Sequence, residues 1–414
     1  MDNNKEVFEN LCSFCGRNEQ EVRILVRGEW ANICGECSED IYDMVQKGLG
    51  KKKEAAISNI SEAIKTNIAK DKPAKIVEFL DEWIIGQDSA KKHIAVAVYN
   101  HYKRLVSKEA HDVEIEKSNM LLVGPTGTGK TLIARTIARM LGVPFAIADA
   151  TALTEAGYVG EDVESIISRL LQAADYDVEA AQRGIIFIDE VDKIARKGDN
   201  PSITRDVSGE GVQQALLKIL EGAVVNVPPQ GGRKHPDQKY IQVDTRNILF
   251  IAGGAFGGIE RKIAARLNTR VVGYGEQTKN AKIDKDNMLQ YVTSADVRTF
   301  GLIPELVGRL PVICHLEPLG KDALLNILTE PKNAIIKQYK ALFAMDGVRL
   351  TVDKAALEVI VDRAVSDKLG ARGLRAICER VMLDAMFEIP GSDIKTLRVT
   401  KQYVEKMIKG TSES

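Results

Sequence analysis

Long apolar runs, aromatic side chains and an excess of charge of either sign are all lacking in this sequence. It has no stretch of about 18 consecutive apolar residues, and the segment 1–6 carries none of the apolar core of a signal peptide. Aromatic residues make up 5% of the chain, and 57 Lys and Arg residues balance 58 Asp and Glu residues. The sequence therefore predicts a cytoplasmic protein that binds neither a membrane nor nucleic acid.

Cysteine is also scarce, and four of the six cysteines form two C-x-x-C pairs near the N-terminus. Cys12 and Cys15 are separated from Cys34 and Cys37 by eighteen residues, a spacing typical of structural zinc sites. In a reducing compartment this pattern favours a metal over disulfides. Four thiolates would close a tetrahedral Zn²⁺ site and leave no open position for catalysis.

The segment between the cysteine pairs holds more apolar residues than a minimal zinc module requires. Two interpretations stay open, a surface for dimerisation or adaptor binding and burial inside the module. The residues concerned are Val22, Ile24, Leu25, Val26, Trp30 and Ile33.

Shifts in composition divide the rest of the chain. A chain of 414 residues exceeds one ordinary core, so several domains are expected. We predict a zinc-binding domain at 1–50, a polar linker at 51–72, a large domain at 73–315, a small domain at 316–400, and a C-terminal helix and tail at 401–414.

Short apolar runs alternate with helical patterns in the large domain, which predicts a parallel sheet covered on both faces and hence an α/β fold. These runs are Met120–Val123, Pro144–Ile147, Ile185–Ile188, Ile248–Ile251 and Pro311–Ile313. Beyond about residue 316 the pattern becomes mostly helical, with short strands at 348–352 and 396–399. Cys314 and Cys378 lie among apolar residues and are predicted to be inert core side chains.

A glycine-rich segment follows the first of these runs and opens a helical pattern at Leu132. It matches G-x-x-x-x-G-K-[ST] in the context that a phosphate-binding loop requires. The segment reads Gly124, Pro125, Thr126, Gly127, Thr128, Gly129, Lys130, Thr131. Its backbone N–H groups would surround phosphate oxygens, Lys130 would contact the β- and γ-phosphates, and Thr131 would bind Mg²⁺.

Two adjacent carboxylates, Asp189 and Glu190, end another apolar run. Taken alone they also fit an ordinary helix N-terminus. The phosphate loop about sixty residues upstream favours hydrolysis, with Asp189 at Mg²⁺ and Glu190 polarising the attacking water.

Taken together, these motifs resemble the ClpX family of AAA+ motors. The likeness also runs through Arg233–His235, Gly301–Arg309 and Gly370–Arg375. It implies an AAA+ parallel sheet with a small helical C-terminal domain and an N-terminal four-cysteine zinc module, binding ATP, Mg²⁺ and Zn²⁺. It further implies a homohexamer that unfolds tagged or unfolded substrates, with adaptors, and delivers them to the ClpP peptidase, or acts as a chaperone without it.

The resemblance assigns roles that residue types alone leave open. It makes Arg309 an arginine finger on a neighbouring subunit's nucleotide, and Arg372 a sensor that couples nucleotide to domain rotation. It places adenine against Ile85 and Gly86. Without the resemblance, both arginines are better explained as surface ion pairs, and the segment 84–86 fits equally well as an apolar lead-in to a helix.

Contacts with substrate and with the peptidase are likewise implied by the resemblance. Tyr158 and Val159 would grip the polypeptide in the pore, 196–204 would form a lower pore loop, and the Arg233, Lys234, His235 segment would form a basic collar. For docking on ClpP the family uses an aliphatic-Gly-Phe loop, whereas this chain has Val272, Gly273 and Tyr274. At Gly253–Gly254, where many AAA+ proteins have a polar sensor, we assign none.

Two other functions fit the sequence less well than an ATP-driven motor. A nucleic-acid remodeller would need a basic, aromatic-bearing groove, which the composition disfavours. A zinc scaffold with a degenerate motor conflicts with the intact Lys130, Asp189, Glu190 and Arg309. Because G-x-S-x-G, H-E-x-x-H and cysteine-protease signatures are all missing from the sequence, any peptide cleavage must come from another chain.

Overall fold

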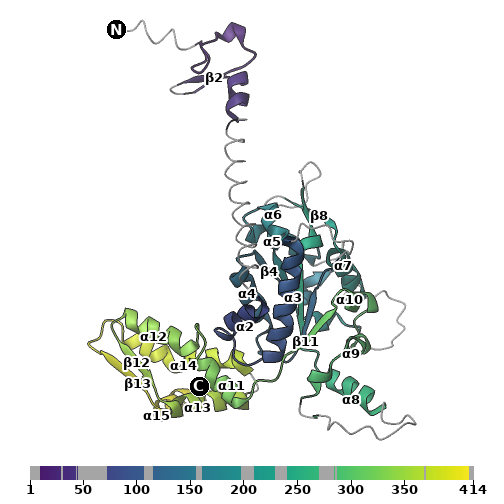
Figure 1. The fold of residues 1–414 in the computed structure, drawn as a ribbon. Helices are drawn as coiled ribbons and strands as arrows, with labels where there is room; N and C mark the ends of the chain where they lie inside the picture. The colour runs from purple at the N-terminus through teal and green to yellow at the C-terminus, as the bar shows by residue number, and fades with distance from the viewer. Residues whose placement is uncertain are drawn as a thin grey trace. The chain divides into compact units, whose positions relative to one another are not determined.

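Five short apolar strands form a parallel β-sheet at the centre of the larger unit (Figure 1). The strands follow the order β11-β3-β10-β7-β4, and each neighbouring pair is parallel. Their bounds are β3 Met120–Val123, β4 Phe145–Asp149, β7 Ile185–Asp189, β10 Leu249–Gly254 and β11 Val312–His315. All four residues of β3 and all six of β10 are buried, which explains their unbroken apolar character and confirms the predicted sheet.

The computed structural model describes residues 10–28, 31–42, 44, 72–106, 115–154, 161–196, 209–228, 240–269, 284, 287–367 and 370–409. The chain separates into two compact units, Met1–Ala63 and Ile64–Ser414.

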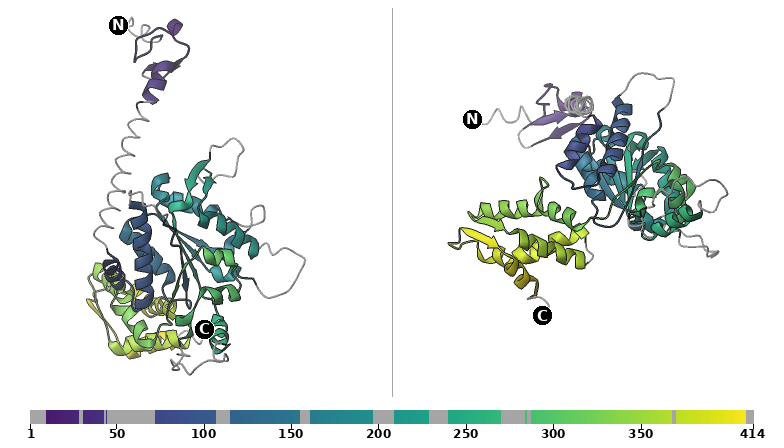
Figure 2. Two further views of the ribbon diagram at one scale, coloured as in Figure 1. Left: turned by 45° about the vertical axis from the view of Figure 1, so that its right-hand side comes forward. Right: turned by 60° about the horizontal axis from the view of Figure 1, so that its bottom comes forward.

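Helices lie on both faces of the central sheet (Figure 2). The helices of this part of the unit are α2 Pro73–Asp81, α3 Asp88–Val106, α4 Lys130–Leu141, α5 Ser165–Ala173, α6 Val178–Ala181, α7 Glu210–Glu221, α8 Ile259–Thr269, α9 Ser294–Phe300 and α10 Pro304–Gly308. The 3-10 helices of this part are η2 Ala150–Ala152, η3 Val191–Ile194, η4 Thr245–Asn247 and η6 Met288–Tyr291. Outside the central sheet, β5 Leu153–Thr154 pairs with β6 Glu161–Asp162, and β8 Val224–Val227 pairs with β9 Ile241–Asp244.

The C-terminal part of the same unit is mostly helical, as predicted. Its elements are α11 Lys321–Thr329, α12 Ile335–Met345, β12 Arg349–Val352, α13 Lys354–Ser366, α14 Gly370–Glu388, β13 Thr396–Val399 and α15 Lys401–Lys409. β12 and β13 pair in parallel. Leu374, Val381 and the buried thiol of Cys378 belong to one apolar cluster that joins these elements. Burial raises the pKa of Cys378 to about 12, which agrees with an unreactive core thiol.

The smaller unit is built around its cysteines rather than around an apolar core. It contains η1 Glu19–Glu21 and the antiparallel strands β1 Leu25–Arg27 and β2 Asn32–Cys34, and residues 35–42 are helical. Among the described residues of this unit, Cys12 and Cys34 are the fully buried non-polar side chains. Ile24 is 64% exposed and Val26 is 54% exposed, so burial inside the module does not account for these two.

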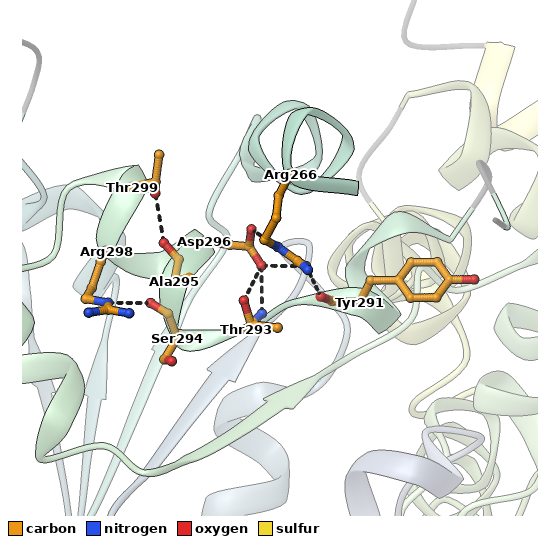
Figure 3. A network of polar contacts seen from close by, with 8 residues as sticks. All are labelled: Arg266, Tyr291, Thr293, Ser294, Ala295, Asp296, Arg298 and Thr299. Atoms are coloured by element: carbon orange, nitrogen blue, oxygen red, sulfur yellow. Dashed lines mark hydrogen bonds and ion pairs between the residues drawn. The ribbon is translucent and has the colours of Figure 1, made fainter. Parts of the chain in front are cut away.

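An ion pair between a partly buried arginine and a buried aspartate joins α8 to α9 (Figure 3). Arg266 donates to Asp296 from Nε at 2.8 Å and from Nη2 at 3.0 Å, and Nη2 also donates to the carbonyl oxygen of Tyr291 at 2.7 Å. Asp296 in turn caps its own helix by accepting from the backbone N–H of Thr293 at 2.9 Å. The pair therefore fixes α8 against the helix that leads to α10.

Candidate functional site

The four cysteines predicted to bind zinc lie together. Their sulfur atoms are all within 4.8 Å of one another, and the sulfurs of Cys15 and Cys34 are 3.7 Å apart. Backbone N–H groups point at this cluster, because the amide of Cys34 donates to Cys12 Sγ at 3.2 Å and that of Cys37 donates to Cys34 Sγ at 3.4 Å. The chain thus gathers two cysteine pairs, separated by eighteen residues, into a small unit with little other core.

The protonation behaviour of the cluster fits a metal-binding role. Burial raises the pKa of Cys12, but the backbone N–H groups of Cys15, Cys34 and Phe14 outweigh it and lower the pKa to about 6. Hydrogen bonding with the sulfur of Cys34 raises the pKa of Cys37. Four thiolates this close repel one another unless a cation neutralises them, so the donor set fits Zn²⁺ bound by four thiolates.

The phosphate-loop residues line a cavity of about 530 Å³ at the carboxyl ends of β3 and β7. Gly129 precedes α4 with φ of +99°, a conformation that favours glycine, and so allows the loop to turn directly into the helix. The lining comprises Thr126, Gly127, Gly129, Lys130, Thr131, Leu132, Asp189, Glu190, Asp192, Lys193, Ala255, Ile327, Ile335, Ala371, Arg372 and Arg375. The sheet edge thus collects most of the residues predicted to contact nucleotide.

Lys130 is buried inside its own loop. Its Nζ donates to the carbonyl oxygen of Gly124 at 2.7 Å and to that of Pro125 at 3.0 Å. Burial lowers the pKa of Lys130, and the charges of Asp189 and Asp192 oppose this shift. An anion entering the cavity would supply the charge that this ammonium group lacks in its immediate contacts.

Thr131 and the two adjacent acids meet on the other side of the loop. Thr131 Oγ1 donates to Asp189 Oδ2 at 3.2 Å. Glu190 has φ of +56° in the left-handed region, and its N–H donates to Asp189 Oδ1 at 2.9 Å. A non-glycine residue rarely adopts this conformation, and such strain is common at functional sites. A hydroxyl beside a carboxylate is a donor set that suits Mg²⁺.

Asp192 lies in the same cavity and was not singled out from the sequence. It is buried, and its carboxylate accepts from the N–H of Ala255 at 3.1 Å and from the N–H of Phe256 at 3.2 Å. It thereby holds the segment after β10 against η3. The sequence could have pointed to this residue, because it is the third acid in Asp189-Glu190-Val191-Asp192.

The small C-terminal part lines the same cavity from the side opposite the phosphate loop. Arg372 and Arg375 of α14 line the cavity together with Ile327 of α11 and Ile335 of α12. The charge of Arg372 contributes to the lowered pKa of Lys130, in keeping with their shared cavity. Sequence reasoning predicted Arg372 but missed the two isoleucines and Arg375, because helix periodicity does not reveal which helix faces a distant loop.

Ile85 and Gly86 do not belong to the described lining of this cavity. They lie at a bend before α3, where Gln87 joins them to the start of the small part. Gln87 Nε2 donates to the carbonyl oxygen of Glu317 at 2.8 Å, and the N–H of Glu317 donates to Gln87 Oε1 at 2.8 Å. This reciprocal pair places the bend at the connection between the two parts of the unit.

Arg309 is also outside the described lining of the cavity. It follows α10 at the amino end of β11, whereas the phosphate loop follows the carboxyl end of β3. Its guanidinium contacts Glu221 Oε1 from Nε at 3.1 Å and from Nη2 at 2.9 Å, and both side chains are about half exposed. Within one chain, therefore, Arg309 forms the surface ion pair considered above.

The remaining predicted contact residues lie outside the described residues. They are Tyr158 and Val159, which fall between β5 and β6, residues 197–204 of the predicted lower pore loop, Arg233, Lys234 and His235, which fall between β8 and β9, and Val272, Gly273 and Tyr274, which follow α8. Within the part of the chain that is described, no helix has the length and apolarity needed to cross a membrane.

Comparison with known proteins gives three family matches along the chain. Residues 10–47 match the ClpX C4-type zinc finger, residues 115–313 match the AAA domain (Cdc48 subfamily), and residues 319–395 match the C-terminal, D2-small domain of ClpB protein. These matches agree with the thiolate cluster, with the phosphate-loop sheet and with the helical C-terminal part.

Curated relatives are similar over nearly the whole chain. The ATP-dependent Clp protease ATP-binding subunit ClpX of Porphyromonas gingivalis is 61% identical over 402 residues, 97% of either chain. The protein of the same name from Bacteroides fragilis is 62% identical over 399 residues, 96% of this chain and 95% of the relative. Together with the zinc-finger match and the AAA domain, this similarity shows that the chain belongs to the ClpX family of AAA+ ATPases.

Proposed function

We propose that this chain is an ATP-driven protein unfoldase that works as a homohexamer in the cytoplasm and passes its substrates to the ClpP peptidase. The observation that carries the proposal is the cavity shared by the phosphate loop, the Asp189–Glu190 pair and Arg372. It combines anion-binding, hydrolytic and small-domain residues in one place. Curated relatives are named as ATP-binding subunits of a protease, which supports the choice of partner.

ATP binding would begin at the phosphate loop. The ammonium group of Lys130 would leave the carbonyl oxygens of Gly124 and Pro125 for phosphate oxygens, which offer full negative charge in a partly buried site. Thr131 and Asp189 would hold Mg²⁺, which supplies charge neutralisation to the phosphates when bound.

Hydrolysis requires a base or water-positioning group beside the γ-phosphate. Glu190 lines the cavity directly after the end of β7, where its backbone is in the left-handed region. We assign Glu190 to polarising the attacking water.

Work on a substrate requires that cleavage of ATP move one part of the chain against another. Arg372 and Ile335 contact the nucleotide cavity from the small part, so loss of the γ-phosphate would weaken the contacts that hold the two parts together. The Gln87–Glu317 pair and the ion pair between Lys332 and Glu82, at 2.6 Å, lie at their connection and would guide the movement. Ile85 and Gly86 belong to the same connection, and their contact with adenine stays a prediction.

A ring is favoured by the position of Arg309. Because it lies at the amino edge of the sheet, away from its own phosphate loop, a second subunit is the natural recipient of its charge. Tyr158 and Val159 as pore residues, Arg233, Lys234 and His235 as collar, and Val272, Gly273 and Tyr274 as the ClpP contact remain sequence predictions that complete the proposal.

The zinc unit is proposed to bind partners rather than nucleotide. Its exposed Phe14, Ile24 and Val26 are large apolar side chains on a unit with few other buried ones. We assign this surface to dimerisation or to adaptor and substrate binding.

The proposal is tested with a tagged, folded reporter, ATP and ClpP. The wild-type chain should unfold the reporter and, with ClpP, allow its degradation. Glu190→Gln should keep ATP binding and lower hydrolysis by at least about 100-fold, because the water loses its base. Glu379→Gln, on the exposed face of α14 and outside the described cavity lining, is the matched control. Undiminished hydrolysis by Glu190→Gln, or ATPase stimulation by DNA instead of unfolded protein, would contradict the assignment.

A further inference from the structure

Two buried amide side chains hold the ends of α10, the short helix that Arg309 follows. At its beginning, the N–H of Ile303 donates to Gln213 Oε1 at 2.8 Å. At its end, Asn119 Nδ2 donates to the carbonyl oxygen of Arg309 at 3.1 Å. Gln213 has no exposed surface and Asn119 is 2% exposed. Polar groups this deeply buried are costly unless they are fully bonded, so these contacts define the place of α10 closely.

The amide of Gln213 has a second set of partners. Its Nε2 donates to the carbonyl oxygen of Ile194 at 2.7 Å and to that of Gly301 at 3.4 Å. Two carbonyls on one side of the amide and an N–H on the other admit a single orientation of the group. Ile194 ends η3, which begins directly after Glu190. Gln213 therefore joins the segment behind the catalytic acids to the start of α10.

The backbone around this amide leaves no room for adjustment. The N–H of Arg196 donates to the carbonyl oxygen of Gly301 at 3.0 Å. Gly301 has φ of +132°, and a Cβ at this position would lie 2.6 Å from the carbonyl oxygen of Arg196. Only glycine fits such an approach, so the segment before α10 is packed tightly against the segment after η3.

Gln213 lies on α7, and the same helix also meets the arginine directly. Glu221 is the last residue of α7 and accepts from both Nε and Nη2 of Arg309. This ion pair is half exposed and contributes little energy. The buried amide bonds at Gln213 are therefore the contacts by which α7 locates α10.

We propose that Gln213 is a positioning residue for Arg309, the group that the proposed function assigns to a neighbouring subunit's γ-phosphate. A displacement of about 1 Å in a catalytic group can cost on the order of 100-fold in rate, and an arginine finger is worth about 1,000-fold or more. Loss of the amide should thus slow hydrolysis in the subunit that receives the arginine, not in the subunit that carries the substitution.

Rings mixed from two variant chains distinguish the subunit that supplies Arg309 from the subunit that hydrolyses ATP. Chains with Arg309→Ala keep their own acids but offer no arginine, and chains with Glu190→Gln offer the arginine but cannot hydrolyse. Each is inactive alone, and their mixture should hydrolyse ATP where a Glu190→Gln chain presents Arg309 to an Arg309→Ala chain. Gln213→Met is then placed on one chain type at a time. Gln214→Met is the matched control, because Gln214 is exposed and its side chain donates to Glu210 at 3.4 Å, away from α10.

The proposal expects ATPase of the mixture to fall about tenfold or more when Gln213→Met is on the Glu190→Gln chain. On the Arg309→Ala chain it should change less than about twofold. A loss confined to the Arg309→Ala chain would overturn it, since Gln213 would then support only its own acids. Gln213→Glu serves as a second variant, because it keeps the acceptor for the N–H of Ile303. If both Gln213→Met and Gln213→Glu lower the ATPase equally in either placement, the role of Gln213 is purely structural and the proposal is overturned as well.

Failure of the proposed function gives a different result. If the parental mixture without any Gln213 substitution stays inactive while wild-type rings hydrolyse ATP, Arg309 does not act across subunits. That outcome removes the shared site and the role of Gln213 with it.

Discussion

The pair between Arg266 and the buried carboxylate of Asp296 should be worth several kcal/mol to its part of the fold. Asp296 is 2% exposed and accepts four hydrogen bonds, from Nε and Nη2 of Arg266 and from the N–H and Oγ1 of Thr293 (Figure 3). Asp296→Ala leaves the guanidinium without its anion and α9 without its cap, a loss of about 3 to 5 kcal/mol. The exposed pair between Lys321 and Asp362 offers the control, since Asp362→Ala should cost at most about 1 kcal/mol.

Hydrogen exchange at the amides of α8 and α9 measures this local opening without requiring two-state unfolding of a large chain. Protection there should fall by roughly 100- to 4,000-fold in Asp296→Ala, whereas the amides around Asp362 should hardly change in its own variant. Burial raises the pKa of Asp296, but hydrogen bonds from Arg266 and Thr293 outweigh it and keep the pKa below its usual value. The stabilisation is therefore complete at neutral pH and is lost as the pH falls below about 4. Unchanged protection at neutral pH would refute the reasoning.

Two further predictions concern zinc and acid. Cys34→Ser should reduce bound zinc from about one per chain to nearly none, as measured by metal analysis of the purified protein. Cys314→Ala should retain the zinc, because that thiol is buried in β11. Full zinc content in Cys34→Ser would exclude the four-sulfur site. Burial lowers the pKa of His101 to about 3, so the unfolded chain takes up this proton first and stability falls as the pH drops below about 6.5. His101→Leu should therefore lose about 3 kcal/mol less than the parent between about pH 7 and pH 4 in denaturant titrations, and equal losses would contradict this.

The nucleotide and zinc sites were predictable because their chemistry is local in sequence. A phosphate loop needs its glycines, lysine and threonine within eight residues, and each cysteine pair lies within one turn. Continuous apolar runs likewise predicted the strands, because strands buried on both faces have no polar side. The pairing order β11-β3-β10-β7-β4 did not follow from any of these runs alone.

The roles of the isolated arginines were harder to predict from the sequence. Arg309 and Arg372 are each one cation among 57, and only their positions on opposite edges of the unit distinguish them. Resemblance suggested both assignments; the cavity contains Arg372, while Arg309 pairs with Glu221 within its own chain.

The sequence by itself determined the local patterns, because the strands, the phosphate loop, the paired acids and the cysteine pairs are each formed by residues close together in the chain. Only the tertiary structure decided that Ile327 and Ile335 face the phosphate loop and that Gln213 joins Ile194 to Ile303. These contacts join residues that are up to about two hundred positions apart in the sequence. They arise because packed helices bury apolar side chains against whatever surface the fold brings near and must give every buried polar group a partner there.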